Sequence, residues 1–446
     1  MGQQHLDDVF ASLLARRGTQ GRLRRLTLPS PGSVDFSSNS YLSLSSDAAV
    51  QASYLERLGR ACHQGHFSLG SGGSRLLDGN TPVAEALERE IAAFHGAPAA
   101  LLFNSGFEAN TGLFSCAPQK GDVVLFDELI HASVHDGMRL SRARRVPFRH
   151  NCVRGGDDGR DGSSSTGLKS LDDLLTELTS GEQGIQNVKT GRSNVFVAVE
   201  SVYSMDGDLA PLKDIVECVE KRLHHGNGYI IVDEAHSTGW IGGRGRGLVS
   251  HLGLESRVWA RVHTFGKAMG CAGAAVLCSP TTRSYLINYA RSLIYTTAMA
   301  YPALAGIQTA YEYLQSGQIE QRLDHLRLLM RHTHHVLTSL ISRARPTRDI
   351  LHINEGPPQS PIVPLFTSKA RSLGQHCQER GFMVRPIVAP TVPAGTDRVR
   401  LCLHAGNTVE EVELLCNAVE AWVRQQMETR IPVETTYRRS RQSSKL

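Results

Sequence analysis

Side chains that could do chemistry follow several apolar runs of this sequence. Lys267 lies among small residues in the run HTFGKAMG, directly after a short β-branched and aromatic stretch. Asp233 stands near the end of the run YIIVDE, and His236 follows three residues later. A lysine kept away from water has a depressed pKa, and its neutral amine is the form that attacks carbonyl groups. The sequence therefore indicates carbonyl chemistry at Lys267.

A turn that could bind an anion completes the set. The turn Asn104–Phe107 contains a glycine and leads toward an expected helix, so its backbone N–H groups could hold a phosphate. Pyridoxal phosphate needs an anion cradle, a carboxylate for its ring nitrogen and a lysine for its aldehyde. Plainer interpretations stay open, because such turns are common and Asp233 could cap a helix or join a buried ion pair. Asp233 and His236 could also bind a metal, although no third ligand is evident.

The elements that must position these residues are short, continuous apolar runs. Strands buried on both faces have this pattern, and stretches long enough for a crossover helix separate most of the runs. Ligands bind beyond the carboxyl ends of such strands. The sequence predicts an α/β domain with a mostly parallel sheet, whose strands fall at 99–104, 122–127, 144–148, 195–201, 229–234, 262–265 and 274–278.

The remaining segments suggest how the chain is divided. Residues 82–95 should form a helix, because Thr81 can cap it, Pro82 suits its first turn and Gly96 its end. Segment 154–192 is expected to be a surface excursion, flexible at both ends around one short helix, LKSLDDLLTEL. We expect an N-terminal helix and arm, a large domain, a smaller α+β domain and a flexible tail, at 1–45, 46–314, 315–428 and 429–446.

Composition narrows the class of protein. The 446 residues carry a net charge of +5, which gives no reason to expect nucleic-acid binding, and no apolar run is long enough to cross a membrane. The nine cysteines form no C-x-x-C pair and are expected to be reduced in an intracellular protein. The chain ends in Ser444-Lys445-Leu446, which predicts recognition by a peroxisomal import receptor; without it the protein would be cytoplasmic.

Longer motifs resemble those of the α-oxoamine synthases, fold-type I pyridoxal-phosphate enzymes that condense an amino acid with an acyl-CoA. The resemblance runs from about residue 36 to 403. It implies a large domain around a seven-stranded, mostly parallel sheet and a smaller C-terminal α+β domain. Its densest motifs are GSGGSRL at 70–76, LLFNSGFEAN at 101–110, ESVYSMDGDLAPL at 200–212, VDEAHSTGWIGGRGRG at 232–247, TFGKAMGCAGAAVL at 264–277, SLIYTTAM at 292–299 and APTVPAGTDRVRL at 389–401.

The resemblance implies a role for each residue around the cofactor ring. Lys267 would bind the pyridoxal aldehyde and later move the substrate's α-proton. Asp233 would pair with the pyridinium nitrogen, and His131 would stack on the ring face. Ser204 and His236 would contact the ring oxygen.

The resemblance also implies phosphate and substrate contacts. Arg400 would bind the amino-acid carboxylate with Asn39 nearby, and Thr391 and Arg24 would touch the acyl substrate. The active site would be shared across a homodimer. The phosphate ligands would be Ser105, Gly106, Phe107, Thr264 and, from the partner subunit, Thr296.

The activity implied is the condensation of L-alanine with pimeloyl-CoA, which gives 8-amino-7-oxononanoate, CoA and CO2 in biotin biosynthesis. The run AHSTG at 235–239 favours the alanine-using branch, since glycine-using branches more often read H-A-V-G. Two positions depart from the pattern: Ala84 stands where many members have histidine, and Val388 where pimeloyl-accepting members often have arginine. Arg385 or the cluster at 22–25 could compensate for Val388.

Three other functions would also fit parts of this sequence pattern. An α-oxoamine synthase could use another acyl-CoA, or glycine, in a different pathway. A non-catalytic partner subunit would have lost the lysine, whereas Lys267 is present here. A plain fold-type I aminotransferase would release no CoA.

Overall fold

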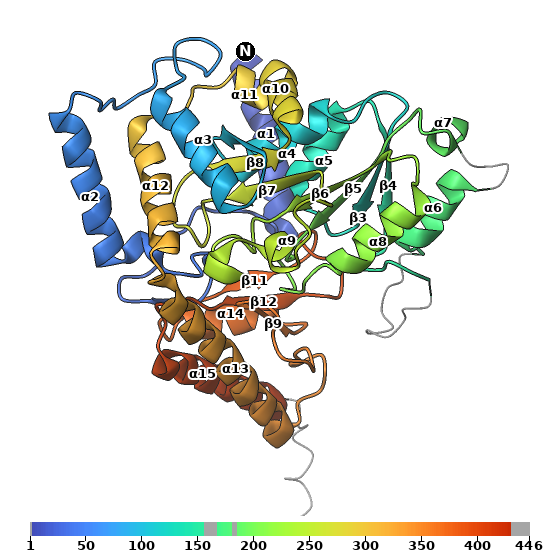
Figure 1. Ribbon diagram of the computed structural model, residues 1–446. Helices are drawn as coiled ribbons and strands as arrows, with labels where there is room; N and C mark the ends of the chain where they lie inside the picture. Colours follow the sequence, from blue (N-terminus) through green and yellow to red (C-terminus); the bar gives the residue numbers. More distant parts are fainter. Residues whose placement is uncertain (1, 156–166, 181–184, 430–446) are drawn as a thin grey trace, which may run out of the picture.

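The predicted strands form one seven-stranded sheet in the order β2-β8-β7-β6-β5-β3-β4 (Figure 1). The computed structural model describes residues 2–155, 167–180 and 185–429. All neighbours pair in parallel except β8, which is antiparallel to both β2 and β7. The prediction of a mostly parallel sheet is confirmed. The strands are β2 Ala99–Phe103, β3 Val123–Asp127, β4 Arg144–Phe148, β5 Val195–Glu200, β6 Gly228–Asp233, β7 Ala260–Thr264 and β8 Ala274–Cys278.

Helices bury both faces of this sheet. Ile231 of β6 packs into one apolar layer and its neighbour Val232 into the other, which explains why the strands read as continuous apolar runs. One face is covered by α4 Gly106–Cys116, α5 Ala132–Leu140, α10 Pro280–Tyr289 and α11 Arg291–Ile294. The other is covered by α3 Pro82–Phe94, α6 Leu171–Thr179, α8 Leu212–Arg222, α9 Leu248–His251 and α12 Tyr301–Gln315.

The helix expected at 82–95 shows how local sequence sets these boundaries. The Thr81 hydroxyl accepts from the Ala84 amide at 3.2 Å, and Pro82 occupies the first turn, where no amide hydrogen is needed. The helix ends at Phe94, and Gly96 follows with a φ of +62°. Leu87 and Ile91 are buried against the sheet.

The helix expected within segment 154–192 packs against the large domain. This helix, α6, buries Leu171, Leu174, Leu175 and Leu178, and Asp172 forms an ion pair with Arg222 of α8. A short helix, α7 Gln186–Lys189, follows. The expectation of flexible ends falls on 156–166 and 181–184, outside the described residues.

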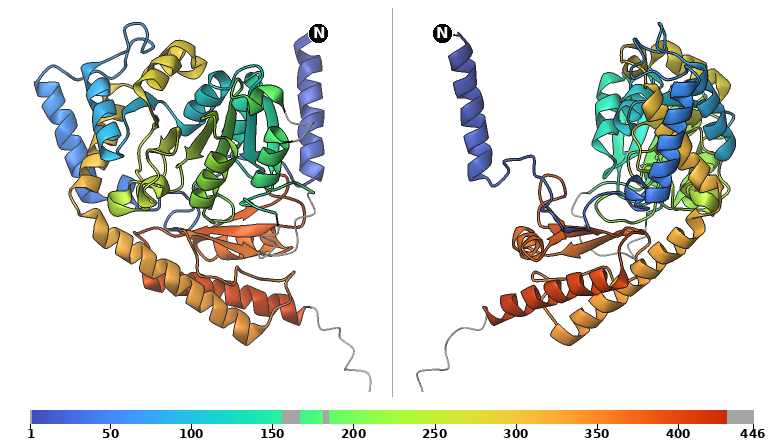
Figure 2. Two further views of the ribbon diagram at one scale, coloured as in Figure 1. Left: turned by 45° about the vertical axis from the view of Figure 1, so that its right-hand side comes forward. Right: turned by 90° about the vertical axis from the view of Figure 1, so that its left-hand side faces the viewer.

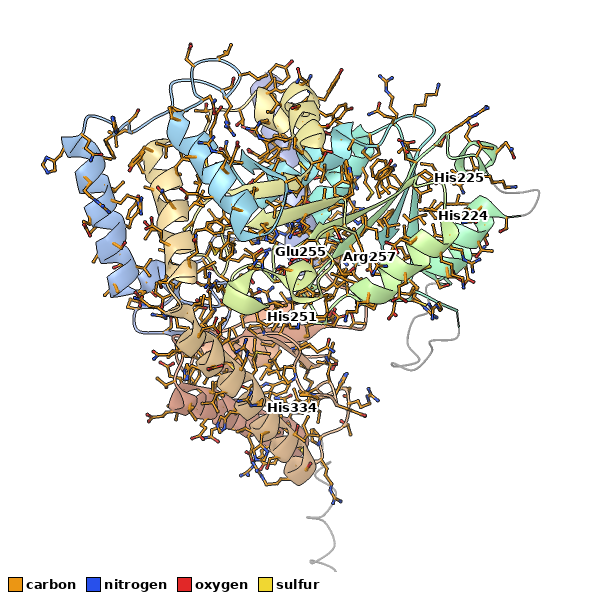
Figure 3. The ribbon with its side chains drawn as sticks, viewed as in Figure 1. His224, His225, His251, Glu255, Arg257 and His334 are labelled. Atoms are coloured by element: carbon orange, nitrogen blue, oxygen red, sulfur yellow. The ribbon has the colours of Figure 1, made fainter. Side chains whose placement is uncertain are left out.

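Polar side chains such as Arg257, which bonds Glu220, and the exposed His224 and His225 lie on the outside of the molecule (Figure 3).

A second, antiparallel sheet lies below the first, with strand order β11-β12-β9 (Figure 2). The apolar run at 382–387 is split, so that β10 pairs in parallel with the short N-terminal strand β1 and only the remainder joins β12. Helix α15 begins with a capping box between Thr408 and Glu411. The elements are β1 Val34–Asp35, β9 Ile362–Phe366, β10 Phe382–Met383, β11 Arg385–Ile387, β12 Arg398–Cys402, α13 Ile319–Ala344, α14 Ala370–Gln378 and α15 Val409–Glu428.

The N-terminal helix α1, Gly2–Thr19, stands away from the rest of the chain (Figure 2). Arg371 of α14 donates to the Gly21 carbonyl at 2.7 Å just after it, and α2, Ala48–His63, follows at the start of the large domain. Of the described helices, none is long and apolar enough to cross a membrane. Helix α1 presents exposed apolar side chains at helical spacing: Leu6, Val9, Phe10, Leu13 and Leu14.

Candidate active site

The predicted site residues gather at the carboxyl ends of the parallel strands. Asp233 ends β6, Glu200 ends β5 and lies opposite Asp233 in the strand register, and Lys267 follows β7. His131 follows β3, and the turn from Asn104 follows β2. Parallel strands end at the same edge of a sheet, so residues far apart in the sequence meet there.

Lys267 is presented by a tight connection between the antiparallel strands β7 and β8. The Phe265 amide bonds the Gly273 carbonyl at 2.9 Å, and the Cys271 amide bonds the Phe265 carbonyl at 2.9 Å. Burial lowers the pKa of the Lys267 amine, while Asp233 and Glu200 act in the opposite direction. The amine has no hydrogen bond or ion pair within the described ranges. It is a partly desolvated amine available to a carbonyl carbon.

Asp233 is buried as a carboxylate with two fixed donors. Its Oδ2 accepts from Asn110 Nδ2 at 2.7 Å and its Oδ1 from the Ala235 amide at 2.8 Å. Two donors on one carboxyl group fix its orientation. The same Asn110 nitrogen also donates to the Ser133 hydroxyl at 3.0 Å. A buried anion held in this way fits the protonated nitrogen of a pyridinium ring.

His131 forms the N-cap of α5 and is held by Ser133. The Ser133 amide donates to His131 Nδ1 at 3.2 Å, and the Ser133 hydroxyl lies 2.7 Å from the same atom. Burial lowers the pKa of His131, so its imidazole is neutral. Since Nδ1 accepts, the proton of the neutral ring is on Nε2. Asn110 and Ser133 thus join His131 to Asp233.

The phosphate turn is built from the start of α4 and the end of β7. Ser105 caps α4 by accepting from the Glu108 amide at 3.2 Å, which leaves the amides of Gly106 and Phe107 without an intrahelical acceptor. The Thr264 hydroxyl lies so close to Gly106 that a Cβ there would come within 2.2 Å of Oγ1. Two free backbone amides and a hydroxyl group can donate hydrogen bonds to a phosphate, and the absence of a side chain at Gly106 lets the phosphate come close to the backbone.

Thr296 lies beside this turn within its own chain. Asn104 Nδ2 donates to the Thr296 hydroxyl at 3.4 Å and to the Thr297 carbonyl at 2.9 Å. The neighbouring side chains Phe107 and Tyr295 are 47% and 72% exposed, an unusual state for aromatic residues next to a buried site. The structure contains one chain, so the expected contact of Thr296 with a partner's phosphate stays a prediction.

Arg400 begins a hydrogen-bonded chain that ends at His236. Its guanidinium donates to the Ser204 carbonyl at 3.0 Å and to Asn39 Oδ1 at 3.1 Å. The Tyr41 hydroxyl lies 3.3 Å from Asn39 Oδ1 and 2.7 Å from His236 Nδ1. The Nε of Arg400 is buried without a partner among the described residues, so this donor is free for a substrate carboxylate. Burial lowers the pKa of His236 well below its usual value, and the imidazole is neutral.

A half-buried histidine joins two loops of the site. His150 Nδ1 lies 2.8 Å from Asp127 Oδ1, and Nε2 lies 2.8 Å from Asp208 Oδ2. These two carboxylates outweigh the effect of burial and raise the pKa of His150 to about 11, so the ring is a cation. Asp127 begins the loop that carries His131, and Asp208 belongs to the loop of Ser204.

The residues expected at the acyl substrate lie outside the hydrogen-bonded network of the site. Thr391 and Arg24 are exposed, and within the described ranges no hydrogen bond or ion pair joins them to Lys267 or Arg400. Val388 packs against the core instead of facing a polar partner. The structure thus brings together the cofactor residues, Asn39 and Arg400, and leaves the two acyl candidates at the periphery.

Four residues of the site were not singled out by the sequence patterns. Asn110 lies within the motif LLFNSGFEAN and Tyr41 within the run FSSNSYLSLS at 36–45, at the start of the resemblance. A donor to the buried Asp233 and a partner for His236 could have been sought there. Ser133 lies two residues after His131 and could have been inferred as a local cap. Glu200 ends an apolar strand next to Asp233; burial and Asp233 raise its pKa well above the usual value.

Comparisons with known proteins agree with this geometry. Residues 31–419 match the aminotransferase class I and II family. The chain is 51% identical over 424 residues, 95% of this chain and 97% of the relative, to an 8-amino-7-oxononanoate synthase of Emericella nidulans. It is 38% identical, over 91% of this chain and 84% of the relative, to the aminoacyl transferase sphA of Aspergillus fumigatus. A serine palmitoyltransferase from S. paucimobilis, solved with bound PLP and myriocin, superposes with a TM-score of 0.72 at 26% identity and 88% coverage of both chains.

Proposed function

The chain belongs to the class I and II aminotransferase family as an α-oxoamine synthase that uses pyridoxal phosphate, and from this premise we propose that it condenses L-alanine with pimeloyl-CoA. The products are 8-amino-7-oxononanoate, CoA and CO2. The observation that carries the proposal is the grouping of Lys267, Asp233 and His131 at one edge of the large sheet, where Arg400 of the second sheet bonds the loop after β5. A relative with 51% identity over 95% of the chain supports the choice of substrates.

The residues of the chain bind the cofactor at three points. Lys267 would bond its aldehyde, Asp233 would pair with its ring nitrogen, and the turn at Ser105–Phe107 with Thr264 would hold its phosphate. His131 would stack on the ring face, and because it is neutral it would not repel the pyridinium charge. Ser204 and His236 would contact the ring oxygen. When bound, pyridoxal phosphate supplies an electron sink for the carbanion formed at the substrate's α-carbon.

The same residues bind alanine and move its proton. Arg400 binds the alanine carboxylate through its unpaired Nε, and Asn39 keeps the guanidinium in place. When the amino group of alanine replaces Lys267 on the aldehyde, the freed lysine amine would accept the α-proton, and burial favours its neutral form. The carbanion then attacks the thioester carbonyl, and the C–S bond breaks so that CoA leaves as a thiolate that takes up a proton from water. Loss of CO2 from the β-keto acid removes the carboxylate that Arg400 held, and the protonated Lys267 returns its proton to the α-carbon.

The purified protein with pyridoxal phosphate tests the function directly. Thiol release should be greatest with pimeloyl-CoA and L-alanine when acetyl-, succinyl- and octanoyl-CoA are each tested with alanine and glycine. Mass spectrometry should detect 8-amino-7-oxononanoate. Lys267→Ala should release no thiol and should lose the absorbance between 330 and 430 nm that reports the lysine-bound cofactor. Failure to release thiol from any pair would contradict the proposal.

A second function is favoured by one specific observation. The aminoacyl transferase sphA is 38% identical over most of the chain, and Val388 offers no charge to an acidic acyl chain. An α-oxoamine synthase for another acyl-CoA or for glycine would keep the same cofactor residues. The substrate panel distinguishes the two, because this alternative predicts faster thiol release from an acyl-CoA other than pimeloyl-CoA.

Assembly and location belong to the same proposal. The exposed Phe107 and Tyr295 beside the phosphate turn support a homodimer in which Thr296 reaches the partner's phosphate. The C-terminal Ser444-Lys445-Leu446, outside the described residues, supports import into peroxisomes. A fluorescent protein fused before residue 1 should colocalise with a peroxisomal marker, and deletion of the three residues should leave it in the cytosol. The same distribution for both fusions would contradict peroxisomal import through this signal.

A further inference from the structure

Arg385 shares a sheet face with the substrate arginine Arg400. It lies in β11, directly opposite Arg400 of β12 in the antiparallel register. Residues paired in this way direct their side chains to the same face of the sheet. Pro386, the next residue, faces the other way: its ring lies against Gly374 of α14, where an added Cβ would come within 3.1 Å of it. The face that carries Arg385 is therefore the one that contributes Arg400 to the active site.

The charge of Arg385 is unpaired, unlike those of its neighbours. Arg400 bonds Ser37, Asn39 and Ser204, and Arg398 forms an ion pair with Asp206. Arg385 is half-buried and makes no hydrogen bond or ion pair across the part of the chain that the structure describes. A guanidinium offers five donors in a planar fork that matches a carboxylate or a phosphate. A half-buried fork without an internal partner is suited to an anion on a ligand.

The N-terminal arm passes beside the strand that carries Arg385. The Val34 amide bonds the Gly381 carbonyl at 2.8 Å, and β1 pairs with β10 just before β11 begins. The carboxylate of Asp35 in β1 accepts from the amides of Ser37 and Ser38 and forms no ion pair with Arg385 among the described residues. The cation of Arg385 therefore stays available to a negatively charged group of a ligand.

We propose that Arg385 is a specificity-determining residue that binds the distal carboxylate of a dicarboxylic acyl-CoA. The inference rests on the proposed function, because it names the group that selects its acyl substrate. Arg400 is only 8% exposed and is already fixed beside Asn39 and Ser204, which suits the small amino acid. Arg385 stands on the edge strand next to it, where the far end of a longer substrate can bind. It supplies the cation that Val388 does not.

Two thioesters that differ only at the far end of the chain test this role. Pimeloyl-CoA and octanoyl-CoA are compared, each with L-alanine, in the wild type and in Arg385→Ala. The ratio of kcat/KM for pimeloyl-CoA to that for octanoyl-CoA should fall at least about tenfold, the effect expected for a hydrogen bond to a charged group. Arg385→Lys should retain part of the preference. Arg380→Ala, at an exposed arginine of the adjoining helical end, should leave the ratio unchanged.

Other outcomes overturn the inference. An equal loss of kcat/KM with both thioesters would mean that Arg385 binds a CoA phosphate. A higher KM for alanine, with no change for the thioesters, would mean that Arg385 assists Arg400. An unchanged ratio would remove any role in specificity. Absorbance of the bound cofactor and a thermal melt show that each variant is folded.

Calorimetric binding of the same two thioesters provides a readout that does not need turnover. If the wild type turns over neither thioester, the proposed function fails. A preference for binding pimeloyl-CoA that Arg385→Ala abolishes would still support the inference, and equal binding of both thioesters would overturn it.

Discussion

At the scale of single residues, the site relies on buried polar groups that hold one another. Asn110 is 2% exposed and donates to both Asp233 and Ser133, so one amide fixes the carboxylate and, through Ser133, the ring of His131. A buried carboxylate deprived of a donor loses both orientation and stabilisation of its charge. Asn110 is therefore a positioning residue for the cofactor.

Replacing Asn110 tests this role. Asn110→Ala should weaken pyridoxal phosphate binding about tenfold or more, the order expected for a hydrogen bond to a charged group, while the protein remains folded. Titration of the apoprotein with the cofactor, followed by absorbance, gives the dissociation constant. Asn288→Ala changes an exposed asparagine and should leave the constant unchanged. Equal constants for wild type and Asn110→Ala would show that Asp233 needs only its backbone donor.

His150 gives a prediction about pH. Its pKa is raised from 6.5 to about 11 by Asp127 and Asp208, so the folded state binds a proton that the unfolded state releases above pH 6.5. The stabilisation is fully present below pH 6.5 and is lost as pH rises toward 11, with a slope of at most about 1.4 kcal/mol per pH unit. Urea unfolding at pH 6, 7.5 and 9 should show the free-energy gap between wild type and His150→Gln narrowing with pH.

A matched variant separates this effect from the general pH dependence of the protein. His225 is exposed, and the free energy of unfolding of His225→Gln should match that of the wild type at all three pH values. A gap between wild type and His150→Gln that stays constant from pH 6 to 9 would mean that His150 is not charged in the folded protein. Since His150 joins the loops of His131 and Ser204, the variant should also raise the KM for alanine.

At the scale of elements, the first turn of α4 forms the phosphate site. Gly106→Ala would place a methyl group within 2.2 Å of the Thr264 hydroxyl, so the turn and the strand end must separate. We expect cofactor binding to be lost while the helix persists, since alanine is the better helix former. Absorbance measures the bound cofactor and circular dichroism the helix content.

Gly59 provides the control for that substitution. It lies inside α2 with nothing within 4 Å of an added Cβ, so Gly59→Ala should bind the cofactor normally and be slightly more stable. Normal cofactor binding by Gly106→Ala would contradict the placement of the phosphate at this turn.

The elements also show what the sequence could and could not predict. Short apolar runs identified all seven strands of the large sheet, because the inner strands are buried on both faces, and even the edge strand β4, with Arg144 and Arg145 exposed, keeps an apolar end. The apolar run at 382–387 divides between two sheets, because its first part pairs with Val34–Asp35, a partner that only tertiary structure supplies. Asp233 and Lys267 were predictable from strand ends, whereas the pairing of Arg385 with Arg400 depends on register, which a single strand pattern does not determine.

At the scale of the whole molecule, α1 exposes an apolar stripe that a partner surface could cover. Its apolar side chains Leu6, Val9, Phe10, Leu13 and Leu14 are exposed, and the helix stands apart from the rest of the chain (Figure 2). An isolated helix of this length gains little from its own hydrogen bonds and is stabilised mainly by packing. A second copy of the chain would supply that packing in the proposed homodimer.

Two aspartate substitutions on α1 test the assembly. Leu13→Asp places a charge in the apolar stripe and should raise the dimer dissociation constant at least about tenfold, because burying an unpaired charge costs several kcal/mol. Ala15→Asp lies on the opposite side of the helix and should leave the constant unchanged. Sedimentation velocity across a dilution series measures both. Identical constants for the two variants would show that the stripe does not contribute to the dimer.

The hydrogen bond between Asn39 and Arg400 joins residues separated by 361 positions. A chain emerging from the ribosome therefore cannot complete its carboxylate pocket until nearly all of it has been translated, although the strands that carry Asp233 and Lys267 are made much earlier. A cofactor bound to Lys267 at that stage would lack the residues that bind the substrate carboxylate. The carboxylate pocket is therefore completed after the cofactor residues Asp233 and Lys267 have been synthesised.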